Sequence, residues 1–234
     1  MQDEITKHSK KIYETAKNPG QTLGDKVKDI IIEIFIIVFA VSLSIWLHSW
    51  SEHKEHQREV SEFLLDMKED LNSDINNNQA AKDALTKTIS NLTFLESLTE
   101  SKVDSLIKTK SPFGFSSSIG TTKLSTANYE GFKSSGKIGY IDNKDLKKHI
   151  LKYYQEALPN ILEVEKINAA QVIKISDFWA ENAEQDIRKI VLSPKFKTML
   201  ESFRSTSKSS LGLYQDAIGQ AAQINSEIEK QAAK

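Results

Sequence analysis

Apolar residues along the chain form one continuous run, and beyond it they recur in helical patterns. The run covers residues 30–50, IIIEIFIIVFAVSLSIWLHSW, with Glu33 as its one formal charge. As a helix it would be roughly 30 Å long, which is the thickness of a bilayer's hydrocarbon core. Trp46 and Trp50 lie at its far end, where indole rings favour the membrane interface. The pattern predicts a transmembrane helix over residues 22–50; a cleaved signal peptide and a buried core helix are the alternatives.

Beyond this run, the apolar positions are spaced by four and three residues. They are Val60, Leu64, Met67 and Leu71. Such a heptad seam predicts helix packing, and Trp46, Trp50 and His53 extend its rhythm back into the apolar run. We therefore expect the membrane helix to continue as a stalk over residues 51–110. Asn76–Asn78 favours a turn that folds the stalk into an antiparallel hairpin, with one continuous coiled coil as the alternative.

Turn chemistry interrupts the helical pattern after the stalk. Residues 111–121 contain a proline, two glycines and several serines, which predicts a loop whose two phenylalanines fold back onto a core. Residues 122–234 then follow as a helical outer domain without a convincing strand. Gly136 suits a left-handed C-terminal cap of a first short helix, and Asp142 is expected to cap the next one. The residues of interest around this turn are Tyr129, Gly131, Ser134, Ser135, Gly136 and Tyr154.

Three further helices are expected toward the C-terminus. The first spans Asn160–Leu192 and follows Pro159. Ser193 is expected to cap a short helix that begins at Pro194, and Ser205–Ser210 to form a polar link before the last helix. The predicted fold class is all-α: a single N-terminal transmembrane helix that continues into a helical stalk or hairpin and a helical-bundle extramembrane domain.

Residues 1–21 are expected to form a short cytoplasmic amphipathic segment. A helix would end at the Asn18–Gly20 turn, and Thr22 or Asp25 would cap the membrane helix. Six lysines precede the apolar run, whereas three cations follow it closely: Lys7, Lys10, Lys11, Lys17, Lys26 and Lys28, against Lys54, Arg58 and Lys68. The positive-inside rule therefore favours a cytoplasmic N-terminus. The predicted location is the bacterial inner membrane, with the large C-terminal domain in the periplasm.

Glu33 is unusual because a carboxylate within hydrocarbon costs a few kcal/mol. It lies about one turn inside the apolar run, so its side chain could reach the headgroups. The alternative is a pairing site for a cation or hydroxyl on a neighbouring membrane helix. For the second interpretation, the expected contact residues are Glu33, Ser42, Trp46, Trp50 and His53.

Composition and motifs exclude several function classes. The chain of 234 residues has a net charge of −1 and no cysteine. These values argue against nucleic-acid binding and exclude disulfides, thiolate metal sites and cysteine nucleophiles. Residues 131–137 match GxxxxGK, but Ile138 follows where Mg²⁺ ligation needs Ser or Thr, and a helix precedes the motif, so no nucleotide partner is expected. His53 and His56 lack a third ligand at a fixed spacing, so we expect no metal, no cofactor and no enzyme activity.

Two segments resemble a known family. Residues 29–71 hold an acidic residue that opens an apolar helix, a tryptophan near its end, and then a Leu-x-x-Met-x-x-Asp-Leu run. Residues 126–154 hold a Tyr-x-x-Phe-Lys-Ser-Ser-Gly segment before a Leu…Tyr-Tyr helix. Both are similar to a group of uncharacterised single-pass bacterial inner-membrane proteins. The resemblance implies a helical periplasmic domain and transfers no activity. The chain departs from the family's glycine and asparagines, with Phe39-Ala40 and His48-Ser49 in their place.

Two hypotheses of function follow from these patterns. The first is a non-enzymatic, membrane-anchored accessory or structural subunit of an inner-membrane cell-envelope complex. Its partners would be the lipid bilayer and other membrane-protein subunits, or further copies of itself. The alternative is a sensory or ligand-binding periplasmic helical domain anchored by one transmembrane helix. Its ligand would lie between the Tyr129–Tyr154 hairpin and the Asn160–Leu192 helix.

Overall fold

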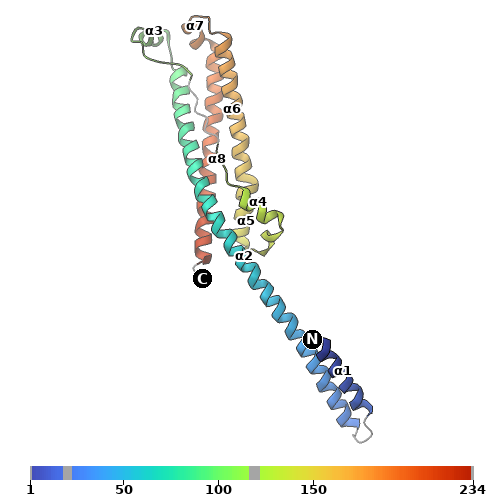
Figure 1. Ribbon diagram of the computed structural model, residues 1–234. Helices are drawn as coiled ribbons and strands as arrows, with labels where there is room; N and C mark the ends of the chain where they lie inside the picture. The colour runs from blue at the N-terminus through green and yellow to red at the C-terminus, as the bar shows by residue number, and fades with distance from the viewer. Residues whose placement is uncertain (1, 18–22, 116–121, 233–234) are drawn as a thin grey trace. The chain divides into compact units, whose positions relative to one another are not determined.

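The computed structural model describes residues 2–17, 23–115 and 122–232, and these residues form helices and connecting segments only (Figure 1). The predicted all-α class is therefore confirmed. The chain divides into two compact units, residues 1–59 and residues 60–234. The long helix α2 (Leu23–Glu96) belongs to both units.

The first unit consists of α1 (Gln2–Lys17) and the first part of α2. The N-terminal helix was predicted; the Asn18–Gly20 turn and the Thr22 cap lie outside the described residues. α2 contains one segment that is long and apolar enough to cross a membrane, and only 6% of its most apolar window is buried by the rest of the chain. The exposure of this segment disfavours a buried core helix, because a core helix would be covered by other parts of its own chain.

Three long helical columns form the second unit (Figure 1). They are α2 from Val60 onward; the continuous column of α5 (Lys144–Lys152), the π-helix η2 (Tyr153–Ala157) and α6 (Leu158–Glu181); and α8 (Pro194–Ala232). The shorter elements are α3 (Glu100–Lys108), α4 (Ala127–Ser134), the 3₁₀-helix η1 (Lys137–Tyr140) and α7 (Ile187–Val191).

Two core clusters fix the direction of the columns. One contains Leu71 of α2, Ile150 of α5 and Ile224 of α8, and the other contains Leu95, Ile175 and Phe203 of the same three columns. Residue numbers therefore rise together in α2 and the α5–α6 column and fall in α8. The predicted stalk and outer domain are not separate bodies, because they share both clusters.

The predicted hairpin turn at Asn76–Asn78 is absent, because α2 runs through these residues to Glu96. The four–three spacing of the seam continues without a break, through residues that are all buried: Val60, Leu64, Met67, Leu71, Asp74, Asn78, Ala81, Leu85, Thr88, Leu92 and Leu95. The helix ends only after Glu96, and Thr99 then caps α3. The continuous alternative is thus correct as far as Glu96 but not to Lys110.

The predicted polar link at Ser205–Ser210 is also wrong. α8 is one helix from Pro194 to Ala232, and Ser207 and Ser210 are completely buried within it. They continue a second four–three seam: Phe196, Leu200, Phe203, Ser207, Ser210, Tyr214, Ala217, Ala221, Ile224 and Ile228. The small serine side chains fit between closely packed helices. The helix therefore continues through these two polar positions.

The remaining helix boundaries differ in detail from those predicted. The long helix expected over Asn160–Leu192 ends at Glu181, and a separate helix, α7, follows it. Asn143 rather than Asp142 caps α5, because its side chain accepts a hydrogen bond from the Leu146 amide at 3.2 Å. Ser193 caps α8 as expected: its hydroxyl accepts from the Phe196 amide at 3.2 Å.

The loop expected over residues 111–121 is non-helical over its described part, residues 111–115. Phe113 and Phe115 are partly buried against the second core cluster, and the rings of Phe115 and Phe203 lie 6.3 Å apart. The phenylalanines therefore fold back onto the core, as their apolar character predicts. Residues 116–121 lie outside the described part of the loop.

Replacing Gly136 by alanine is expected to lower the free energy of unfolding by about 1 kcal/mol, because a Cβ atom is strained at positive φ. Gly136 has a φ of 76° and ends α4, while a Cβ built there meets no neighbouring atom. The cost is therefore one of backbone conformation alone. Urea unfolding of the variant measures it. Gly139→Ala is the matched control, since Gly139 also has open space but no positive φ; equal effects of the two substitutions would contradict this explanation.

Candidate functional site

A buried carboxylate lies where α2, η2 and the segment before α4 meet. Asp74 of α2 is completely buried. Its side chain accepts hydrogen bonds from the Tyr153 hydroxyl at 3.0 Å and from the Ser125 amide at 2.9 Å. A buried charge needs such partners to offset its loss of water. Asp74 thereby joins three segments that are distant in the sequence.

Three tyrosines pack beside this carboxylate. In the π-helix η2 both Tyr153 and Tyr154 are buried, because the wider turn directs two successive side chains inward. The Tyr154 ring stacks on Tyr129 of α4 at 4.2 Å between centroids and meets Tyr153 edge-on at 5.1 Å. Gln155 donates to the Tyr129 hydroxyl at 2.9 Å. The rings therefore fix α4 against η2.

Helix α4 is fastened to α2 as well. Phe132 stacks on Phe63 at 3.8 Å between ring centroids, and the Asn128 amide donates to Asp70 at 2.9 Å. The serines of the predicted turn serve α4 itself: Ser134 and Ser135 donate to carbonyls within that helix at 3.1 and 2.8 Å. The structure thus brings Tyr129 and Tyr154 together, whereas the two serines are exposed at the helix end.

The GxxxxGK segment has no phosphate-binding geometry. Gly131 lies inside α4, Gly136 ends that helix in the left-handed conformation, and Lys137 begins η1. A phosphate-binding loop instead follows a strand and opens a helix with successive amide groups. The segment is a helix end, as the sequence indicates.

Burial raises the pKa of Asp74, although the hydrogen bonds from Ser125 and Tyr153 oppose this effect. Burial also raises the pKa values of Tyr153 and Tyr154 well above the ordinary phenol value, and the nearby Asp74 charge raises them further. Both phenols are therefore neutral across the physiological range, and Tyr153 donates to Asp74. Because Asp74 has no solvent-exposed surface, this arrangement is suited to holding segments together rather than to reacting with a substrate.

The raised pKa of Asp74 predicts a specific pH dependence. The folded chain binds the Asp74 proton more tightly than the unfolded chain does, so this group adds stability as the pH falls through its folded pKa. The difference in unfolding free energy between the parent chain and Asp74→Asn should therefore shift in favour of the parent toward acid. Paired urea titrations between neutral pH and about pH 4 measure that difference. A difference that is constant or shifts the opposite way would contradict the raised pKa.

A second polar layer lies between α6 and α8. Glu165 of α6 is buried and accepts from the Tyr214 hydroxyl at 3.1 Å and the Thr122 amide at 3.0 Å; it also contacts the Thr122 hydroxyl. One turn further, Asn168 donates to the buried Ser210 hydroxyl at 3.3 Å. These contacts tie the segment before α4 into the bundle from a second side.

The sequence interpretation missed Asp74, Asn78, Glu165, Asn168, Ser207 and Ser210. The signal that identifies them is the four–three spacing itself, which places each of them on a buried seam. Polar layers of this kind set helix register in some bundles. At Asn78 the buried position leaves an acceptor unpaired. The Asn78 amide donates to the Asp74 carbonyl at 2.8 Å, but the side-chain oxygen has no hydrogen-bond partner among the described residues.

Glu33 is paired within its own unit. It is 4% exposed, accepts from the Lys11 ammonium at 3.0 Å, and contacts the ring of His8. Within the described residues the carboxylate is therefore paired with α1, and its contact with a neighbouring membrane helix or with headgroups stays a prediction. The other predicted contact residues, Ser42, Trp46, Trp50 and His53, are exposed within their unit. Lys54 covers one face of the Trp50 ring at 3.9 Å from its centroid.

Glu33→Gln is expected to loosen α1, because the neutral side chain loses the charge that pairs with Lys11 and His8. Trypsin should then cleave after Lys10 and Lys11 several-fold faster than in the parent chain reconstituted in nanodiscs. Mass spectrometry of the released peptides follows the cleavage. Glu14→Gln is the control, since Glu14 is exposed on the same helix. Unchanged cleavage in Glu33→Gln would show that the pairing does not hold α1 in place.

The histidines near the apolar run do not form a metal site in the described residues. His48 lies 3.4 Å from Glu52, one turn away on the same helix, and both side chains are exposed. No group of three or more histidine, aspartate or glutamate side chains that could hold a metal ion occurs within residues 2–17, 23–115 and 122–232.

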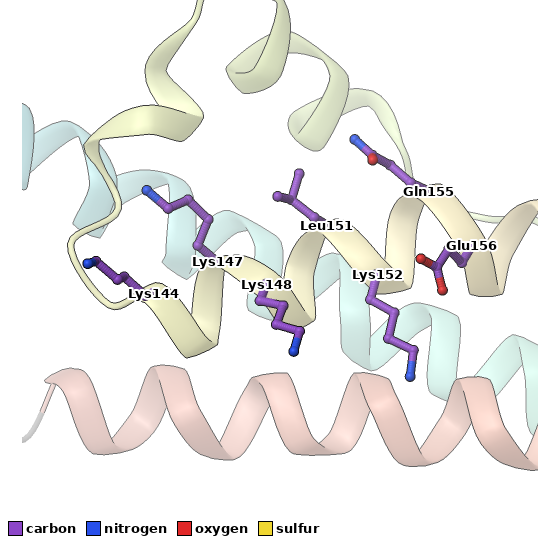
Figure 2. A pocket seen from close by; sticks show the side chains of 7 residues that line it. All are labelled: Lys144, Lys147, Lys148, Leu151, Lys152, Gln155 and Glu156. Atoms are coloured by element: carbon purple, nitrogen blue, oxygen red, sulfur yellow. The ribbon is translucent and has the colours of Figure 1, made fainter.

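One groove on the second unit is strongly basic. It has a volume of about 560 Å³, and Figure 2 shows the side chains that line it along α5 and η2: Lys144, Lys147, Lys148, Leu151, Lys152, Gln155 and Glu156. Its acidic lining residue, Glu156, lies at the η2 end. The groove is therefore a cationic surface on an otherwise charge-balanced chain.

Comparison of the chain with protein-family models, with curated proteins and with solved structures gives no match. The resemblance to single-pass inner-membrane proteins therefore stays a prediction.

Proposed function

We propose that this chain is a non-enzymatic, membrane-anchored accessory or structural subunit of an inner-membrane cell-envelope complex. In this proposal residues 30–50 span the bilayer, the N-terminal end of α2 faces the cytoplasm, and the second unit extends into the periplasm. The observation that carries it is the continuity of α2. One helix contains the uncovered apolar segment and also the first column of the packed bundle.

The use of polar groups in the second unit supports a structural role. The buried acids Asp74 and Glu165 accept hydrogen bonds from other segments of the bundle, and neither is exposed in a cleft. A catalytic acid or base must instead reach a substrate within hydrogen-bonding distance. The rigid bundle is thus suited to presenting its surface to other proteins.

The proposal is tested by purifying the tagged chain in mild detergent after crosslinking in native membranes. We expect crosslinked species that contain other envelope proteins or further copies of the chain, identified by mass spectrometry. The control is a chain whose residues 30–50 are replaced by an unrelated transmembrane helix of equal length. A strictly monomeric particle without any crosslinked partner would overturn the proposal.

The ligand-binding alternative stays a prediction. The rings of Tyr129 and Tyr154 stack on each other, so a ligand would not lie between these two rings. The lysine-lined groove along α5 is open and favours an anion. A thermal-shift screen with small phosphorylated and carboxylated metabolites tests this alternative, and stabilisation that disappears in Lys148→Glu/Lys152→Glu would support it.

A further inference from the structure

Helix α5 presents a cationic face, with Glu156 as the acidic residue of its lining. Four lysines project from its successive turns, Lys144, Lys147, Lys148 and Lys152, with Leu151 between them (Figure 2). Lys147 donates to the Gly139 carbonyl at 3.2 Å. None of the four forms a salt bridge with a residue that the structure describes. Four lysines without a salt bridge, within the nine residues of α5, favour an anionic partner.

Helix α2 carries an acidic face in the same unit. Leu65 is 60% exposed, the exposed Glu69 follows it by four residues, and the exposed Asp66 lies three residues before Glu69. Asp66 and Glu69 form no salt bridge with a described residue. The acids of this face complement the lysines of α5 in charge, whereas Leu151 is partly buried against the first core cluster.

The two faces lie at the same level of the bundle. Tyr153 and Asp74 touch at 3.0 Å, and α2 and the α5–η2–α6 column run in the same direction. Both helices rise by about 1.5 Å per residue. Lys148 lies five residues before Tyr153, and Glu69 lies five residues before Asp74. Lys148 and Glu69 therefore lie at the same level along the bundle. They belong to different outer surfaces, since each helix turns its seam inward.

We propose that the lysine face of α5 docks on the acidic face of α2 in a second copy of this chain. The proposal rests on the proposed membrane anchoring, because anchors of one topology bring the second units of all copies to the same side of the bilayer. Two second units that lie side by side and parallel present these faces to each other at equal height. Since the two faces are different surfaces, the contact is heterologous and repeats from copy to copy, around a ring where its rotation closes and along an open row where it does not.

The proposed contact consists mainly of exposed ion pairs, and this determines how it responds to salt. Exposed ion pairs are individually weak and are screened by salt. Confinement of both copies to one membrane raises their effective concentration and compensates for this weakness. The association should therefore be strong in membranes at low ionic strength and should fall several-fold when salt is raised from 50 to about 500 mM.

Cysteine crosslinking tests the contact directly, because the natural chain has no cysteine. Full-length Glu69→Cys and Lys148→Cys chains, each with its own tag, are co-expressed and oxidised mildly in membranes. We expect a dimer band that carries both tags, at least fivefold stronger than the band from Glu69→Cys with Lys174→Cys. Lys174 is an exposed lysine on α6, further along the bundle. Equal yields from the two pairs would overturn the proposal.

Charge reversal provides a second measurement on the full chain. Lys148→Glu/Lys152→Glu should abolish association in nanodiscs or mild detergent, and so should Asp66→Lys/Glu69→Lys. All four substitutions on one chain should restore it, because every copy then carries both reversed faces. Lys174→Glu/Lys208→Glu, which reverses two exposed lysines elsewhere, is the matched control and should leave association unchanged.

The outcomes separate this inference from the proposed function. Failure of the fourfold variant to restore association overturns the docking of α5 on α2. A chain that has no copy-to-copy contact but crosslinks to a different envelope protein overturns the inference alone. A chain with neither contact overturns both. A ligand-binding role is shown instead if the parent chain is monomeric and a phosphorylated metabolite protects Lys148 from amine-reactive labelling, and this result also overturns the inference.

Discussion

Replacing Asp74 by alanine is expected to lower the free energy of unfolding by about 3 kcal/mol, the larger of the effects expected within the second unit. The substitution leaves the Tyr153 hydroxyl and the Ser125 amide without their acceptor. Each buried, unpaired donor costs about 1–3 kcal/mol, and release of the desolvated charge recovers part of that cost. The segment before α4 should also loosen, because Ser125 is one of its attachments to α2.

Urea unfolding of the full chain in mild detergent, followed by circular dichroism, measures the effect of this substitution. Asp66→Ala is the matched control, since Asp66 is exposed on the same helix; we expect a change within about 0.5 kcal/mol there. Tyr153→Phe removes one of the two donors and should cost about 1 kcal/mol. If Asp74→Ala were no more destabilising than Asp66→Ala, the buried carboxylate would not hold these segments together.

The sequence contained enough information for the helices but not for all of their ends. Local turn chemistry at Asn76–Asn78 competes with the four–three spacing, and the spacing prevails because Asn78 and Asp74 occupy inward positions of the seam. A polar residue at such a position can pair across the bundle, as Asp74 does with Tyr153. The polar residues at these positions therefore do not interrupt α2.

The same reasoning explains the serines of α8. Ser207 and Ser210 resemble a linker when their polarity is considered alone. The Ser210 hydroxyl is satisfied within its own helix, because it donates to the Thr206 carbonyl at 2.8 Å, whereas the buried Ser207 hydroxyl has no hydrogen-bond partner among the described residues. Periodicity that is extended across polar positions would have predicted both long helices. It would not have predicted that Tyr153 and Tyr154 are both buried, which depends on the π-turn.

The candidate site depends on contacts over long sequence distances, and such contacts leave no local signal. Glu33 was identified from its position in an apolar run, but its partners in α1 could be recognised only when the two helices were placed together. Asp74 and Ser125 are likewise joined only by the fold. By contrast, the positive φ of Gly136 was evident from the helix end that precedes it, because that requirement is local.

Replacing both Val38 and Phe39 by aspartate is expected to prevent membrane integration of the chain. Both side chains are more than half exposed near the middle of the apolar segment. An aspartate at the centre of a membrane helix costs about 3 kcal/mol, so two cost about 6 kcal/mol, whereas each replaced residue favoured insertion. The insertion equilibrium should fall by more than about 10⁴-fold. Carbonate extraction of membranes measures the integrated fraction.

Val38→Leu/Phe39→Leu is the control for this substitution and should remain in the carbonate-resistant pellet, because leucine favours insertion. The experiment also separates the three interpretations of the apolar segment. A cleaved signal peptide would give a parent chain that is shorter by the whole segment, as intact mass would show. A core helix would leave the parent chain soluble, and the two aspartates would then unfold it. An anchor predicts a full-length parent chain in the pellet and its loss from the pellet in the aspartate variant alone.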